Sequence, residues 1–257
     1  MVQVKLAQVE KTFQTKNGQN PVLVGIELTI AQGEVIALRG DNGCGKTTLL
    51  NILAGIERPT SGTVLFDGMS SESLRIGYVQ QDYTSSLLPW FDVLENIAIP
   101  LRLNGVSAAE RRERAEKLLN SLGFDNVPRS AYPHQLSGGQ KQKVAVARAL
   151  ISDPHLLLLD EPFANLDAHT SRDLQETLSR MHDSRRPTVI YVSHELDHSI
   201  YLADRIVLLH GSPARIVLEF SVPLQRPRKR EVMLRSEFGD VRSQIFREEE
   251  SLYAKRL

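Results

Sequence analysis

The chain has little that would cross-link it, draw it to a polyanion or place it within a membrane. Cys44 is the single cysteine among 257 residues, so an internal disulfide is excluded and a reducing compartment is expected. Lys plus Arg and Asp plus Glu number 31 each, and this balance argues against a global nucleic-acid-binding surface. No apolar run approaches the length of a membrane-spanning helix, and the first residues lack the apolar core of a signal peptide. Any membrane role is therefore expected to come through a partner or a surface contact.

What the chain does have is a complete phosphate-binding loop. Gly40 is followed after four residues by Gly45-Lys46-Thr47, between an apolar run at 34–38 and a helix-like segment at 48–53. Glycines leave room for backbone N–H groups to face a polyphosphate, Lys46 brings a cation to the β- and γ-phosphates, and the Thr47 hydroxyl can reach Mg²⁺. We therefore expect the chain to bind a nucleoside triphosphate. The expected contacts are Gly40, Asp41, Asn42, Gly43, Cys44, Gly45, Lys46, Thr47 and Thr48.

A second pattern places two adjacent carboxylates after an apolar strand. The run 156–159 is entirely Leu and is followed directly by Asp160 and Glu161. Ligands of open α/β sheets bind at the carboxyl ends of strands, where the phosphate loop also lies. Asp160 is placed to hold Mg²⁺, and Glu161 is placed to orient and polarise an attacking water. The alternative is an ordinary acidic turn, and the complete loop upstream favours the catalytic interpretation.

A third pattern marks the start of a helix. Ser137 and Gln140 have the spacing of a capping box, with Gly138 and Gly139 between them. Two glycines at this position would let a phosphate approach the free N–H groups of the first turn. The alternative is a purely structural helix cap.

The order of the predicted elements indicates an α/β core interrupted by a helical insertion. The continuous apolar runs 156–159 and 189–192 are typical of parallel strands covered on both faces. We assign residues 1–82 and 153–220 to the core, 83–152 to the insertion, and 221–257 to a charged, partly helical tail.

Taken in order, segments 40–48, 136–140 and 156–162 resemble the nucleotide motifs of the ATP-binding subunit of ATP-binding cassette (ABC) transporters. The resemblance spans roughly residues 2–220. It implies an α/β fold, a P-loop NTPase cassette with a mixed, largely parallel β core, an antiparallel β subdomain and a helical subdomain. It also implies an ATPase that couples hydrolysis to solute translocation. Two subunits, expected to form a homodimer, would enclose two ATP, with Ser137, Gly138, Gly139 and Gln140 of one contacting the γ-phosphate bound to the other.

The resemblance implies roles for further residues. His194, after the apolar run 189–192, matches the switch histidine that contacts the γ-phosphate. Gln81 matches the glutamine that senses metal and water, with Gln80 as the alternative. The implied catalytic residues are Glu161, His194, Lys46 and Gln81, and the implied Mg²⁺ ligands are Thr47, Gln81 and Asp160.

Some positions are less regular. Phe13 fits the aromatic that stacks on adenine, with core packing as the alternative. Asn165, in the dimer-interface segment 164–167, replaces the small residue often seen there. Asp41 places a negative charge near phosphate, which is mildly unfavourable, and Cys44 is expected to pack rather than to act as a redox or metal group.

Softer matches concern the partners. Segments 88–97 and 200–205, and the tail around 226–230, resemble the nitrate, sulfonate and taurine importers. This implies permease partners, indirectly a solute-binding protein, a small anionic substrate and a place at the cytoplasmic face of the membrane. Trp90, in the apolar stretch 87–91, would either receive a helix of a membrane subunit or be buried within the helical insertion.

Two other functions stay open. A soluble ABC ATPase could act on a nucleic acid or a protein complex, but such proteins usually carry two cassettes or coiled-coil inserts, and no nucleic-acid partner is expected here. A non-hydrolysing regulator would not need Asp160, Glu161 and His194. The basic run 226–230 could be a membrane-surface patch, but the acidic residues that follow it favour a solvated, self-neutralising tail.

Overall fold

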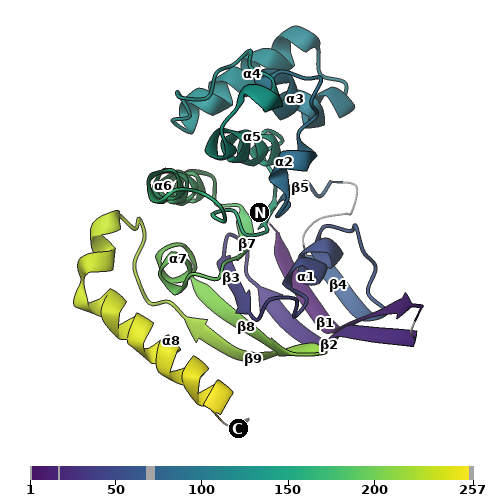
Figure 1. Cartoon of the computed structure of the whole chain (residues 1–257), viewed down its shortest axis with the longest axis vertical. Coiled ribbons are helices and arrows are strands. Elements are labelled where there is room, and N and C mark those ends of the chain that lie inside the picture. Colours follow the sequence, from purple (N-terminus) through teal and green to yellow (C-terminus); the bar gives the residue numbers. More distant parts are fainter. Residues whose placement is uncertain (1, 17, 68–72, 255–257) are drawn as a thin grey trace.

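A nine-stranded sheet organises this computed structural model, which describes residues 2–16, 18–67 and 73–254 (Figure 1). The strand order is β4-β1-β2-β9-β8-β3-β7-β6-β5. The strands are β1 (Gln3–Thr15), β2 (Gly18–Ile30), β3 (Val35–Gly40), β4 (Ser61–Asp67), β5 (Ile76–Val79), β6 (Leu156–Leu159), β7 (Thr188–Val192), β8 (Arg205–Gly211) and β9 (Ala214–Ser221). The predicted core segment 1–82 and the predicted tail 221–257 include positions that lie outside the described residues, namely 1, 17, 68–72 and 255–257.

The centre of the sheet is parallel and buried on both faces. Each neighbouring pair in the run β8-β3-β7-β6-β5 is parallel. Val189 of β7, for example, lies opposite Val35 of β3 on one side and Leu157 of β6 on the other. Because successive side chains of a strand point to opposite faces, Ala37 packs in one hydrophobic cluster and Leu38 in the other. The continuous apolar runs of the sequence are therefore strands that carry a core on each side, as predicted.

The other half of the sheet is mostly antiparallel and more exposed, and only β2 and β9 pair in parallel there. Strand β1 pairs antiparallel with β2 and with β4, and β8 pairs antiparallel with β9. Val4, for example, lies opposite Ile30 on one side and Phe66 on the other. The predicted combination of a largely parallel core and an antiparallel β subdomain is confirmed.

The helices between β5 and β6 form a separate lobe beyond one edge of the sheet (Figure 1). Asp92 caps the start of α3 by accepting a hydrogen bond from the Glu95 N–H, and Ser107 caps α4 in the same way. The helices of this lobe are α2 (Tyr83–Ser86), α3 (Val93–Leu103), α4 (Ala108–Ser121) and α5 (Gly138–Leu150), with a 3₁₀ turn η1 (Pro133–Gln135). Their apolar sides join the hydrophobic cluster on one face of the sheet, so the lobe packs against the strands.

The remaining helices flank the sheet. They are α1 (Lys46–Leu53), α6 (Ala168–Arg185), α7 (Leu196–Leu202) and α8 (Ser236–Ala254), with a 3₁₀ turn η2 (Arg230–Leu234) before α8. Helix α1 packs on the face opposite α6 and α7 (Figure 1). Among the described residues, no helix combines the length and the apolar character needed to cross a bilayer.

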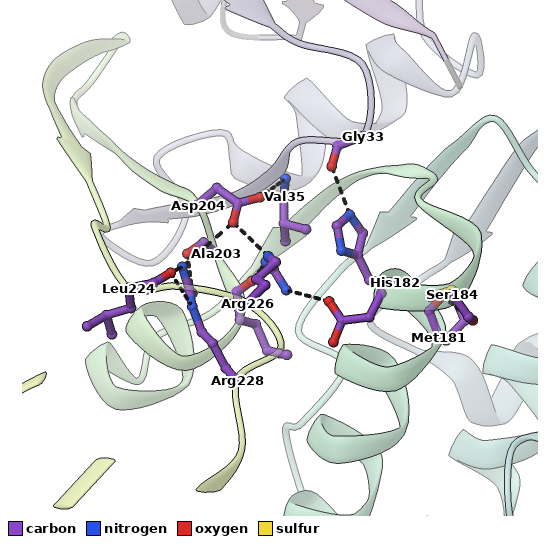
Figure 2. Close-up of polar contacts among 12 residues, drawn as sticks. Gly33, Val35, Met181, His182, Ser184, Ala203, Asp204, Leu224, Arg226 and Arg228 are labelled. Atoms are coloured by element: carbon purple, nitrogen blue, oxygen red, sulfur yellow. Dashed lines mark hydrogen bonds and ion pairs between the residues drawn. The ribbon is translucent and has the colours of Figure 1, made fainter. Parts of the chain in front are cut away.

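The tail differs from the solvated chain that its charge pattern predicted. Arg228 is only 4% exposed and lies against the end of α7 (Figure 2). Its guanidinium donates hydrogen bonds to the backbone oxygens of Ile200, Tyr201, Ala203, Val222 and Leu224. These include carbonyls at the end of α7, which a cation satisfies well. The basic run is therefore partly an internal anchor, and the expectation of a solvated, self-neutralising tail was wrong for Arg226 and Arg228.

Arg226, two residues before Arg228, also contributes to this anchor. Its Nε donates to Asp204 Oδ1 at 2.8 Å, and Asp204 Oδ2 accepts the Val35 N–H at 2.9 Å (Figure 2). On the other side of the same cluster, His182 Nε2 lies 2.8 Å from the Gly33 carbonyl oxygen. The segment before α8 is thus tied to the start of β3, at the end of the sheet opposite the phosphate loop.

We predict that Arg228→Ala lowers the free energy of unfolding by about 2–4 kcal/mol, because several buried carbonyls lose their donor together. Burial lowers the pKa of Arg228 to about 10, so the side chain is charged at neutral pH. Urea denaturation measures the effect, and the exposed neighbour Lys229→Ala is the matched control. Equal stability of the two variants would contradict the anchor.

Candidate functional site

Four adjacent parallel strands deliver the predicted site residues to one edge of the sheet. Strand β3 leads into the phosphate loop, β6 into Asp160 and Glu161, β7 into His194, and β5 into Gln81. Because β3, β7, β6 and β5 are neighbours in this order and run parallel, their carboxyl ends meet. At this edge lies an open cleft of about 560 Å³, lined also by residues of β1 and β2: Phe13, Asn20, Val22, Asn42, Gly43, Gly45, Lys46, Thr47, Thr48, Gln81, Glu161 and His194.

Two glycines of the loop are required by close packing. Gly40 has φ 142°, and a Cβ there would lie 2.1 Å from the Leu209 carbonyl oxygen. Gly45 has φ 110° at the N-cap of α1, and a Cβ there would lie 2.9 Å from side-chain atoms of Val22 and Leu23. Any larger residue would push the loop away from β8 or β2. The loop amides and the start of α1 therefore hold a conformation suited to an anion.

The loop side chains lie in different directions. Lys46 Nζ donates hydrogen bonds of 2.8 Å to the backbone oxygens of Gly40 and Asp41, so the ammonium group lies inside the loop. Asp41 Oδ2 lies 2.9 Å from His210 Nδ1. Asp41 is not among the residues that line the cleft. Cys44 is 6% exposed within a hydrophobic cluster, and burial raises the pKa of its thiol, as expected for a packing residue.

Thr47 and Asp160 form an oxygen-rich pair that fits Mg²⁺. The Thr47 hydroxyl donates to Asp160 Oδ2 at 2.7 Å, and Asp160 is only 2% exposed. Among the described residues, Asp160 Oδ1 has no hydrogen-bond partner, although it is buried. Mg²⁺ binds through one or two carboxylates together with hydroxyl groups, waters and substrate phosphates, so this donor set suits it. Burial, the largest cause, raises the pKa of Asp160.

The predicted alternatives for the glutamine differ in position. Gln81 lines the cleft and is exposed, while Gln80 is not among the lining residues. Of the two glutamines, Gln81 is therefore the one that faces the cleft.

Glu161 and His194 meet directly. Their Oε1 and Nε2 atoms lie 2.7 Å apart, and both side chains line the cleft. Glu161 has φ 50°, a conformation that costs about 1 kcal/mol or more in a residue other than glycine. The turn after β6 thus holds the carboxylate in a strained backbone position that directs it toward the cleft. Asn165, at φ 60° in the next turn, is a residue type that tolerates this conformation.

The predicted signature motif lies elsewhere. Ser137 Oγ accepts the Gln140 N–H at 3.3 Å and Gln140 Oε1 accepts the Ser137 N–H at 3.0 Å, so the capping box at the start of α5 is present. A Cβ on Gly139 would lie 2.6 Å from Thr170 Cγ2, which places the motif against the first turn of α6. None of the residues 137–140 lines the cleft of its own chain.

Phe13 reaches the cleft from β1 and is half-buried. It lies opposite Asn20 on β2, and Lys11 Nζ lies 4.6 Å from the centre of its ring. Asn20 and Val22 also line the cleft, and neither was predicted. Their place follows from the β1–β2 register, for which the sequence carries no separate signal.

The comparisons with known proteins agree on one family. The ABC transporter family model matches residues 23–164. An uncharacterized ABC transporter ATP-binding protein of Methanocaldococcus jannaschii is 41% identical over 231 residues, covering 89% of this chain and 85% of that one. The nitrate import ATP-binding protein of Synechococcus elongatus is 39% identical over 229 residues, covering 88% and 83%.

Solved structures give the same result. A dimeric bacterial ABC transporter cassette has a TM-score of 0.77 at 30% identity and covers 86% of this chain and 100% of its own. A post-hydrolysis dimer of that cassette, bound to ADP and phosphate, has a TM-score of 0.76 at 30% identity, with the same coverage. The chain belongs to the ABC transporter family. It is an ATPase of this family that binds ATP and Mg²⁺.

We predict that Asp160→Asn separates stability from activity. The raised pKa means that the ionised carboxylate destabilises the folded state increasingly as pH rises through that pKa. The metal-free variant should therefore be more stable than the wild type at pH 7.5, and the difference should shrink as pH falls. Its Mg²⁺-dependent turnover should drop by about 100-fold.

Urea denaturation in the presence of a chelator and a phosphate-release assay measure the two effects. Asp125→Asn, an exposed carboxylate of the helical lobe, is the control. A metal-free Asp160→Asn protein less stable than the wild type at pH 7.5 would contradict the prediction.

Proposed function

We propose that this chain is the ATP-hydrolysing subunit of an importer, acting as a homodimer on two membrane subunits. The observation that carries the proposal is the division between two sets of motif residues. Lys46, Glu161 and His194 share one cleft, while Ser137 and Gly139 lie outside it. A second copy that brings its signature motif over this cleft would complete the site. The dimeric cassettes of similar structure support this arrangement.

The residues of the cleft divide the work of phosphoryl transfer. Lys46 and the loop amides neutralise charge on the β- and γ-phosphates, and Phe13 stacks on the adenine. Glu161 accepts a proton from the attacking water, and His194 keeps its carboxylate oriented through the 2.7 Å contact. Thr47, Asp160 and Gln81 would hold Mg²⁺, which when bound neutralises phosphate charge.

The names of the relatives support a small anion as the transported solute. Besides the nitrate importer, an aliphatic sulfonate import protein of Bacillus subtilis is 38% identical over 229 residues. A bicarbonate transport protein of Synechocystis is 41% identical over 249 residues. We propose a substrate of this kind, delivered by a solute-binding protein, with this subunit at the cytoplasmic face of the membrane. The soluble and non-hydrolysing alternatives gain no support from these names.

Trp90 is the proposed contact with the membrane subunit. Its side chain is 66% exposed, so the alternative in which the helical lobe buries it was wrong. It packs edge-on against Phe91, whose ring also lies 5.4 Å from the Arg102 guanidinium. A large, exposed apolar residue just before α3 suits the docking of a helix from a permease.

We predict that Glu161→Gln lowers steady-state ATP hydrolysis by about 100-fold or more while ATP binding persists, because the amide cannot accept the proton of water. Phosphate release and nucleotide binding by fluorescence measure the two properties. Glu195→Gln is the matched control, since Glu195 pairs with His198 instead. Near-normal hydrolysis by Glu161→Gln would refute its role as the base.

We predict that Trp90→Ser leaves the hydrolysis rate of the isolated subunit within about twofold but weakens its binding to membrane subunits by about tenfold or more. Co-purification with co-expressed permease subunits measures binding. Leu65→Ser is the control, because Leu65 is 49% exposed on β4, which is not part of the helical lobe. Unchanged assembly of Trp90→Ser would place the membrane contact elsewhere.

A further inference from the structure

The C-terminal helix lies against the segment that carries His194. Phe238 and Ile245 of α8 are 3% and 1% exposed and join the hydrophobic cluster of the flanking helices. Arg242 Nε lies 3.1 Å from Asp197 Oδ1 on α7, the helix that begins two residues after His194. Helix α8 therefore packs beside α7 (Figure 1).

Near its end, α8 reaches a residue that touches the backbone of His194. Arg39 is the penultimate residue of β3, directly before Gly40, and its Nη1 donates to the His194 carbonyl oxygen at 2.9 Å. The Nε and Nη2 atoms of the same guanidinium donate to Glu249 Oε1 and Oε2 at 3.1 and 3.4 Å. The side chains of Arg39 and Glu249 are 13% and 14% exposed, so water screens their interaction only weakly.

We propose that Arg39 is a positioning residue for His194 and that Glu249 holds Arg39 in this position. The guanidinium bridges the loop that binds phosphate, the switch histidine and the C-terminal helix. Its bidentate contact with Glu249 fixes the plane of the guanidinium, which leaves Nη1 directed at the His194 carbonyl. The backbone of His194 sets where the imidazole meets Glu161, and small displacements of catalytic groups have large effects on rate. This inference rests on the proposed role of His194.

A positioning role and a purely structural role for Arg39 and Glu249 lead to different expectations. Phe238, Ile245 and the Arg242–Asp197 contact hold α8 on the core without Glu249. If Glu249 acts by positioning Arg39, loss of its charge should cost little stability and should leave the adenine and phosphate contacts intact. What should change is the geometry of the switch segment, and therefore kcat rather than KM for ATP.

The test compares Glu249→Gln with Glu248→Gln in the full-length purified chain. We expect Glu249→Gln to lower kcat by about threefold to tenfold, with KM for ATP within about twofold of the wild type. Glu248→Gln removes an exposed carboxylate that contacts only Gln244 among the hydrogen bonds of the described side chains, so its kinetics should be unchanged. Arg39→Met combined with Glu249→Gln should be no slower than Arg39→Met alone, because both changes act through one contact.

Wild-type kcat in Glu249→Gln, or additive losses in the double variant, would overturn the inference. A parallel change in KM, kcat and melting temperature would also overturn it, because that pattern belongs to a structural role. His194→Ala in the same assay distinguishes failure of the positioning role from failure of the proposed role of His194. If His194→Ala loses turnover and Glu249→Gln does not, only the positioning role fails. If His194→Ala keeps turnover, the proposed role of the histidine fails first.

Discussion

The hydrogen bond of 2.7 Å between the Thr47 hydroxyl and Asp160 Oδ2 joins the two halves of the catalytic site. The two residues are 113 positions apart in the chain, yet Asp160 directly follows β6, and Thr47 lies at the start of α1 after the loop that follows β3. Between their strands runs β7, whose end supplies His194. The chemistry depends on this constraint: parallel neighbours must end at one edge for a base, a metal ligand and a phosphate loop to meet. Burial of both sheet faces keeps those strand ends in register.

The helical lobe carries the motif through which the proposed dimer would complete each site. Its helix α5 begins with Ser137 and two glycines, and the close approach of Gly139 to Thr170 places that start beside α6 rather than over the cleft. The same lobe exposes Trp90. One rigid unit therefore carries both the motif proposed to reach a second ATPase and the side chain proposed to contact the membrane partner. A movement of the lobe on nucleotide binding would displace both surfaces together.

The sequence predicted what depends on contiguous residues and missed what depends on register and long-range pairing. The phosphate loop, the Asp160–Glu161 pair and the capping box at Ser137 are local patterns, and the structure has each of them where the pattern places it. The family and the fold were also predicted correctly. Burial of Arg228 was not, because three of its acceptors, Ile200, Tyr201 and Ala203, lie 25 to 28 residues away at the end of α7. The contacts of Asp41 with His210 and of Arg39 with Glu249 join residues more than 150 positions apart, and charge patterns cannot specify such pairs.

The tail joins the two ends of β3, because Arg226 contacts Asp204 beside its start and Glu249 contacts Arg39 near its end, next to His194. The central claim remains that two copies enclose each nucleotide between the cleft of one and the signature motif of the other. A structure of Glu161→Gln with Mg-ATP tests it most directly. The account predicts two nucleotides, each touching Lys46 and Thr47 of one subunit and Ser137 of the other. A nucleotide bound without Lys46 and Asp160, or a Ser137 that faces only solvent, would contradict it.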